Sequence, residues 1–179
     1  MDAEELLEFL IQNGRAWVKA QRDYHRPGAR TLTASEKTAF RPFFAEPIFD
    51  IAQVKRIPVI ENPGFYADLE AMGIPPPLDF RTMEGITFVD TILVSDREHP
   101  PDQPLAPLLF HELVHVVQYA ILGLPAFIGR YVRGWAETGQ DYFSIPLEKD
   151  AYAVQNRYVA QPNASFSVEE EVRRQLGLT

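Results

Sequence analysis

The sequence predicts an α+β fold, in which a small, mostly antiparallel sheet packs on one central helix and further helices follow it. Segments rich in β-branched residues fall between residues 51 and 96. Helical patterns lie before and after them and do not alternate with strands as in a parallel α/β sheet. With 179 residues, 46% of them hydrophobic, the chain can form one domain, 1–179, with its own core.

Residues 1–50 are expected to be a helical scaffold. Apolar residues recur at helical spacing over residues 3–24, and Asp2 with Glu5 has the form of a capping box. Thr33 and Glu36 form a second such box before a short helix. Four phenylalanines follow, and we expect them to pack in the core rather than line a substrate groove. They are Phe40, Phe43, Phe44 and Phe49.

Residues 51–96 are expected to supply the sheet. The stretches AQVKRIPVIE and GITFVDTILVS are rich in β-branched residues, and Asp90 is a candidate turn or bulge within the second stretch. Two or three strands are therefore predicted. The Pro-rich segments IPPPLDF and DREHPPDQP are read as loops.

Residues 103–160 carry the central helices. The first is expected to run to Leu122 and stop at Gly123, and the second to start at Pro125 and end near Thr138. A third should start near Pro146. The tail SVEEEVRRQLG, residues 167–177, has the cap and charge pattern of a terminal helix.

Charge and composition exclude several classes of protein. Lys and Arg total 17 against 25 Asp and Glu, a net charge of −8, so a nucleic-acid partner is not expected. The chain has no cysteine, so any metal must be held by His, Asp or Glu. The acidic start MDAEELLEFL does not resemble a secretory signal, and a cytoplasmic location is expected. Polar residues interrupt the apolar stretch 105–127, which favours a buried helix over a membrane span.

The stretch LLFHELVHVVQYAIL contains the candidate chemistry. His111 and His115 are four residues apart, so one turn of helix places both imidazoles on the same face, where they can share a metal ion. Glu112 lies about a hundred degrees round the helix and can reach a water on that metal without being a ligand. Hydrolysis by a zinc enzyme needs both roles, because the ion activates a water molecule and the carboxylate transfers the proton. Random placement would produce the pattern with a probability of about 0.7%.

A zinc hydrolase needs a third protein ligand. His25 and His99, the other two histidines, are expected in loops before the motif, so an acidic ligand is predicted downstream. Glu148, in the first turn of the helix after Pro146, is favoured. Glu137 is the next candidate. Asp141 and Asp150 are the remaining alternatives.

The pair HELVHVVQY and IPLEKDAY resembles the motifs of gluzincin metallopeptidases, particularly compact bacterial ones with an E-x-x-A-D second motif and ImmA/IrrE-like proteins. The resemblance covers residues 85–158 and implies a zincin-like fold. It also implies that His111, His115 and Glu148 bind zinc and that Glu112 is the general base. One position departs from the pattern, because Tyr152 stands where the E-x-x-A-D type has an aspartate that orients a ligand histidine.

The residues around the motif leave several roles open. Tyr152 is the first candidate to donate a hydrogen bond to the oxyanion, ahead of Tyr142 and Tyr131. Gln118 and Tyr119 either support the metal site or pack in the core. For Arg130 and Arg133 an ion pair is favoured over a substrate contact.

We therefore expect a zinc-dependent metallohydrolase, a peptidase whose partners are peptides or proteins and whose catalytic residues are Glu112 and Tyr152. An alternative is a catalytically inactive zinc-binding or interaction module derived from a metallopeptidase. A metal-free helical scaffold is the third possibility, and metal content distinguishes it from the other two.

Overall fold

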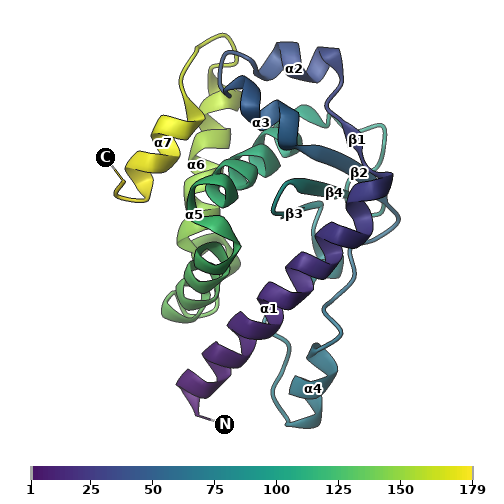
Figure 1. Ribbon diagram of the computed structural model, residues 1–179, viewed down its shortest axis with the longest axis vertical. Coiled ribbons are helices and arrows are strands. Elements are labelled where there is room, and N and C mark those ends of the chain that lie inside the picture. The colour runs from purple at the N-terminus through teal and green to yellow at the C-terminus, as the bar shows by residue number, and fades with distance from the viewer. Residues whose placement is uncertain (1, 179) are drawn as a thin grey trace.

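The computed structural model describes residues 2–178 and has the expected α+β architecture, with a four-stranded sheet beside a long central helix (Figure 1). The helices are α1 (Ala3–His25), α2 (Ala34–Phe40), α3 (Glu46–Ile51), α4 (Tyr66–Ala71), α5 (Ala106–Glu137), α6 (Pro146–Ala160) and α7 (Val168–Gln175). The strands are β1 (Arg30–Thr31), β2 (Gln53–Ile57), β3 (Gly85–Phe88) and β4 (Thr91–Ser95). Short 3₁₀ helices are η1 (Arg26–Gly28), η2 (Phe80–Thr82) and η3 (Tyr142–Ser144).

Local sequence signals account for several helix ends. Asp2 and Thr33 each form the expected capping box, with Glu5 and Glu36 respectively, and Ser167 caps α7. The break expected at Gly123 is also present: this residue has φ 72° and ψ 159°, so α5 is two helical segments joined at a kink. The positive φ favours glycine, which has no Cβ to clash with the backbone.

The sheet is mixed, in the order β1-β2-β4-β3. β3 and β4 form an antiparallel hairpin that turns at Val89 and Asp90, and β1 pairs antiparallel with β2, but β2 and β4 run parallel. All five residues of β4 are buried, so this strand takes a central position between β2 and β3. β3, which is half-buried at its start, forms the edge beside α5.

Two elements lie in segments that were expected to have the other kind of secondary structure. The two-residue strand β1 lies in the segment expected to be only helical, because so short a strand has no detectable alternation. The helix α4 lies in the segment assigned to the sheet, and its six residues are too few for a clear helical period. His25 is the last residue of α1 rather than part of a loop.

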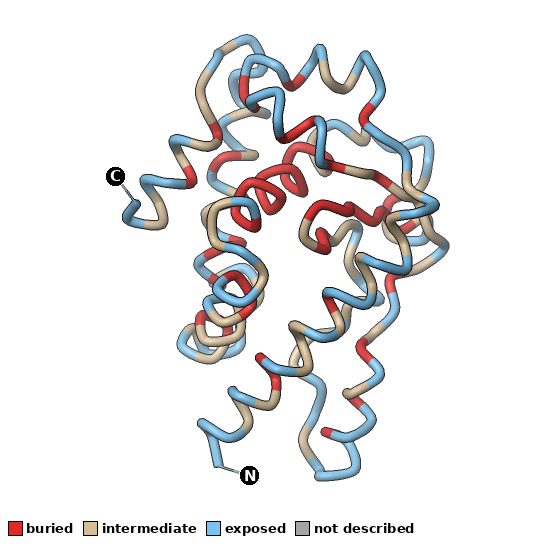
Figure 2. Tube along the Cα trace, viewed as in Figure 1, coloured by how far each residue is buried: buried red, intermediate tan, exposed pale blue. Residues whose placement is uncertain are grey.

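The most buried part of the chain is the first half of α5 (Figure 2). The whole helix α5 contacts α1, α6, α7, β3 and β4. Residues 109–119 of this helix are all buried. The four phenylalanines of the N-terminal scaffold are at most 3% exposed, which confirms their role in the core. The apolar helix α5 meets the length and hydropathy criteria for a membrane span, but 56% of its most apolar window is buried inside the protein, as in the core helix of a globular domain.

Candidate metal centre

Two histidines and one glutamate bring their ligand atoms together in the core. His111 Nε2 lies 3.1 Å from His115 Nε2, and Glu148 Oε2 lies 3.2 Å from the first nitrogen and 3.3 Å from the second. All three residues are at most 5% exposed. The histidines come from one face of α5, as their spacing predicts, and the glutamate comes from the first turn of α6. The three residues together could hold a metal ion.

The other acidic candidates do not reach this cluster. Glu137 is an exposed residue at the end of α5. Asp141 accepts a hydrogen bond from Ser144 on the surface. The Asp150 carboxylate interacts with the charges of Lys149, Arg174 and Glu171, and not with those of the histidines. Glu148 is therefore the acidic side chain that the fold brings to the two histidines.

The distances match the requirements of a tetrahedral ion. Zinc bonds to nitrogen and oxygen ligands at about 2.0–2.1 Å, which places any two ligand atoms of a tetrahedral site about 3.3 Å apart. The three measured separations, 3.1, 3.2 and 3.3 Å, form a nearly equilateral triangle of that size.

Two glutamine amides orient the histidine rings. Gln118 donates from Nε2 to the Leu147 carbonyl (3.0 Å), which turns its Oε1 toward His115 Nδ1 at 2.8 Å. Gln155 donates to the Pro107 carbonyl (3.2 Å) and presents its Oε1 to His111 Nδ1 at 3.2 Å. In this arrangement each Nδ1 carries a hydrogen, and each Nε2 directs its lone pair at the centre of the triangle.

The charges around the triangle favour a cation. Burial works to raise the pKa of Glu148, but its contacts with both histidines dominate and hold this pKa well below its usual range. Burial likewise works to lower the pKa of His115, and the Glu148 carboxylate outweighs it and raises this pKa to about 9. Three lone pairs within 3.3 Å of one another need positive charge between them, supplied by a proton or by a metal ion.

Glu112 lies beside the cluster without joining it. Its side chain is 3% exposed, and the Thr87 hydroxyl of β3 donates to its Oε2 at 2.7 Å. Burial raises the pKa of Glu112 above its usual value, although the two histidines act to lower it. Gly85 leaves room for the carboxylate, because a Cβ there would lie 2.7 Å from Glu112 Oε1.

The three candidate tyrosines have different surroundings. The Tyr131 hydroxyl donates to Glu148 Oε1 at 2.8 Å, so it positions the glutamate. Tyr152 is half-buried, and its ring lies 4.4 Å from the His111 ring. Burial raises the pKa of Tyr152 to about 12, so its hydroxyl stays protonated at neutral pH. Tyr152, His111 and Glu112 line the same groove, of about 580 Å³, as do Tyr142 and His99.

The structure also decides between the roles left open for other residues near the motif. Gln118 contacts His115 of the candidate metal centre, whereas Tyr119 packs in the core, stacked 3.6 Å from the Phe127 ring. Arg133 forms the favoured ion pairs, at 2.9 Å from Glu4 and 2.7 Å from Glu8.

Sequence reasoning missed Gln155 and Thr87. Gln155 lies seven residues after Glu148, which is two helical turns, so it shares a helix face with the glutamate. That spacing could have pointed to Gln155 as the partner of His111 that replaces the missing aspartate. Thr87 gives no comparable signal, because it comes from a distant strand.

Comparisons with protein-family models, with curated proteins and with solved structures each found no match to this chain.

Proposed function

We propose that this chain is a zinc-dependent metallohydrolase with a zincin-like arrangement, a peptidase in which His111, His115 and Glu148 hold the ion. The observation that carries the proposal is the triangle of ligand atoms, with sides of 3.1–3.3 Å and the Nε2 atoms of both histidines at its corners. When bound, zinc would lower the pKa of water and polarise the scissile carbonyl.

Glu112 is the general base of this proposal. It follows His111 on α5 and shares the groove with it, yet its carboxylate is hydrogen-bonded to Thr87 and is free of the ligand triangle. Such a carboxylate takes a proton from the attacking water and delivers it to the leaving amine nitrogen. Tyr152, protonated and in the same groove, is the proposed donor to the oxyanion.

Metal content and turnover test the proposal separately. We expect about one zinc per chain in protein purified without chelators, and loss of zinc in His111→Ala and His115→Ala. Glu148→Gln should also weaken zinc binding, whereas Glu137→Gln, a change on the surface of α5, should not. Glu112→Gln should keep zinc while slowing the cleavage of a peptide library by roughly 10²–10⁴-fold. Zinc binding unaffected by the histidine variants would contradict the proposed centre.

A second candidate is a zinc-binding module without turnover. The observation in its favour is that both histidine rings have a neutral amide partner, Gln118 or Gln155, in place of a carboxylate. If wild-type protein and Glu112→Gln both bind zinc and both leave the peptide library intact, the chain is a zinc-binding module without peptidase activity.

A further inference from the structure

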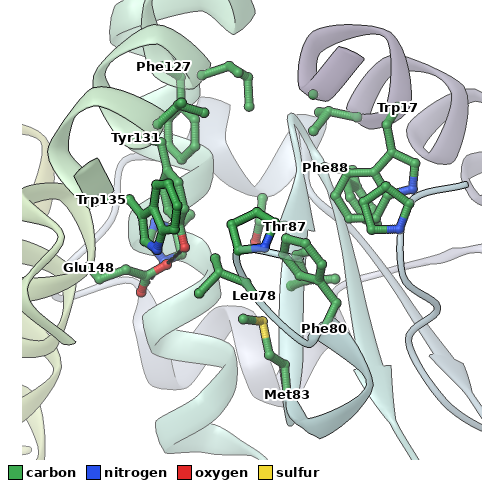
Figure 3. A pocket seen from close by; sticks show the side chains of 18 of the residues that line it. Trp17, Leu78, Phe80, Met83, Thr87, Phe88, Phe127, Tyr131, Trp135 and Glu148 are labelled. Atoms are coloured by element: carbon green, nitrogen blue, oxygen red, sulfur yellow. Dashed lines mark hydrogen bonds and ion pairs between the residues drawn. The ribbon is translucent and has the colours of Figure 1, made fainter. Parts of the chain in front are cut away.

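A second cavity adjoins the metal centre on the side of α1. Its walls come from α1, the segment 63–83, β3 and the second half of α5, which are far apart in the sequence (Figure 3). Glu112, His115 and Glu148 lie at this cavity as well as at the metal centre. A ligand held at the metal can therefore extend into it.

The rest of the lining is mainly apolar. Trp17 packs with its ring 4.8 Å from Phe80 and 5.0 Å from Phe88. The labelled aromatic side chains Phe127, Tyr131 and Trp135 of α5 lie on the opposite wall in Figure 3. Sites for small ligands typically combine such an apolar wall with a few polar groups at one place, where the reacting part of the ligand is bound.

The size of the cavity limits what it can hold. Its volume is about 120 Å³. An apolar protein cavity of about 150 Å³ accommodates one benzene molecule. The cavity is therefore suited to one large side chain, such as that of leucine or phenylalanine, and is too small for a long acyl chain.

We propose that this cavity binds one large apolar side chain of the peptide substrate next to the bond that is cut. This inference rests on the proposed peptidase function and adds the substrate class. It also gives residues 1–83 a role, because α1 and the segment before β3 supply the wall that selects the side chain. Burying a side chain of this size should favour a leucine or phenylalanine substrate over its glycine counterpart by roughly 10- to 100-fold in kcat/KM.

Binding can be measured without turnover, because both tryptophans of the chain, Trp17 and Trp135, line the cavity. We would titrate zinc-loaded Glu112→Gln protein with four probes and follow tryptophan fluorescence. The probes are N-acetyl-phenylalaninamide, N-acetyl-leucinamide, N-acetylglycinamide and decanoate. Saturable changes are expected with the first two probes, and at least tenfold weaker binding with N-acetylglycinamide. Equal responses to all three amides, or tighter binding of decanoate, would overturn the inference.

Two variants alter the cavity and one serves as a control. Phe80→Ala enlarges it and should shift the preference from leucine toward bulkier side chains, whereas Leu78→Phe narrows it and should weaken binding of the phenylalanine probe. Tyr24→Ala removes an aromatic side chain of α1 that is 75% exposed. This control variant should change neither the side-chain preference nor the binding of the phenylalanine probe. Circular dichroism checks that each variant is folded. Folded cavity variants that keep the wild-type preference would also overturn the inference.

The two proposals fail in different ways. Selective binding of the apolar amides without peptide cleavage would overturn the peptidase activity and leave the cavity as a binding site for one apolar side chain. Cleavage that depends on Glu112 but shows no preference for apolar side chains would overturn only the assignment of the cavity.

Discussion

At the scale of single residues, the positions of the side chains in the site depend on contacts with elements that are distant in the sequence. The Glu112 carboxylate is positioned by the Thr87 hydroxyl and by the space that Gly85 leaves, both from β3. The histidine rings are oriented by Gln118 from their own helix and by Gln155 from α6. The proposed general base and the candidate metal ligands are thus supported by residues from three elements, β3, α5 and α6.

Gly85→Ala tests the support of Glu112. The new Cβ would lie 2.7 Å from Glu112 Oε1, which is too close for two non-bonded atoms. The carboxylate is the flexible end of its side chain, so we expect it to move. We expect kcat for peptide cleavage to fall roughly 10- to 100-fold while zinc content stays at the wild-type level. Gly64→Ala is the matched control, since nothing lies within 4 Å of a Cβ at that position. Wild-type kcat in a folded Gly85→Ala protein would show that this contact does not position Glu112.

At the scale of elements, an ion-pair cluster ties α1 to the β3–β4 turn. Asp90 lies 2.8 Å from Arg22 Nη2 and 2.9 Å from Arg26 Nη1. Burial works to raise the pKa of Asp90, but the hydrogen bonds from Arg22 and Thr91 outweigh it, and the pKa lies below its ordinary value of 3.8. The cluster holds the helix that forms one wall of the apolar cavity.

Asp90→Asn should therefore destabilise the protein at neutral pH, by roughly 1–3 kcal/mol, because charged hydrogen bonds are lost. A carboxylate with a lowered folded pKa stabilises the protein above its unfolded pKa, and this contribution is lost as the pH falls through the folded pKa. The difference in Tm between the wild type and Asp90→Asn should shrink below about pH 4. Asp23→Asn, at an exposed ion pair, should have a smaller effect. A Tm difference that stays constant down to pH 2 would contradict this role of Asp90.

At the scale of the whole molecule, the candidate metal centre lies between α5 and α6, two helices of the core. His111 and His115 belong to α5 and Glu148 to α6, and these helices pack closely against each other. An ion that binds only the folded chain stabilises it by mass action. Zinc binding should therefore stabilise the contact between α5 and α6.

Zinc at about a hundred times its dissociation constant should raise Tm by roughly 5–10 °C for a chain of this length. The chelator EDTA should reverse the rise, and His111→Ala should abolish it. Magnesium, which prefers oxygen ligands, serves as the control ion and should leave Tm unchanged. An equal rise in wild type and His111→Ala would place zinc elsewhere on the protein.

The sequence by itself determined the local features of this protein. Caps at Asp2 and Thr33, the break at Gly123 and the shared helix face of His111 and His115 each depend on residues within about one turn of one another. Asp90 was likewise a candidate turn or bulge, and it lies in the β3–β4 turn. The α+β class followed from the order of strand and helix patterns along the chain. The choice of Glu148 over Glu137 came from a local helix start combined with a resemblance between motifs.

Only the tertiary structure decided how these parts meet. The parallel pairing of β2 with β4, the convergence of Glu148 on the histidines, the contacts of Gln155 and Thr87, and the cavity walled by α1 all join segments far apart in the sequence. Periodicity and caps report interactions along the chain, whereas such contacts depend on which surfaces must be buried together.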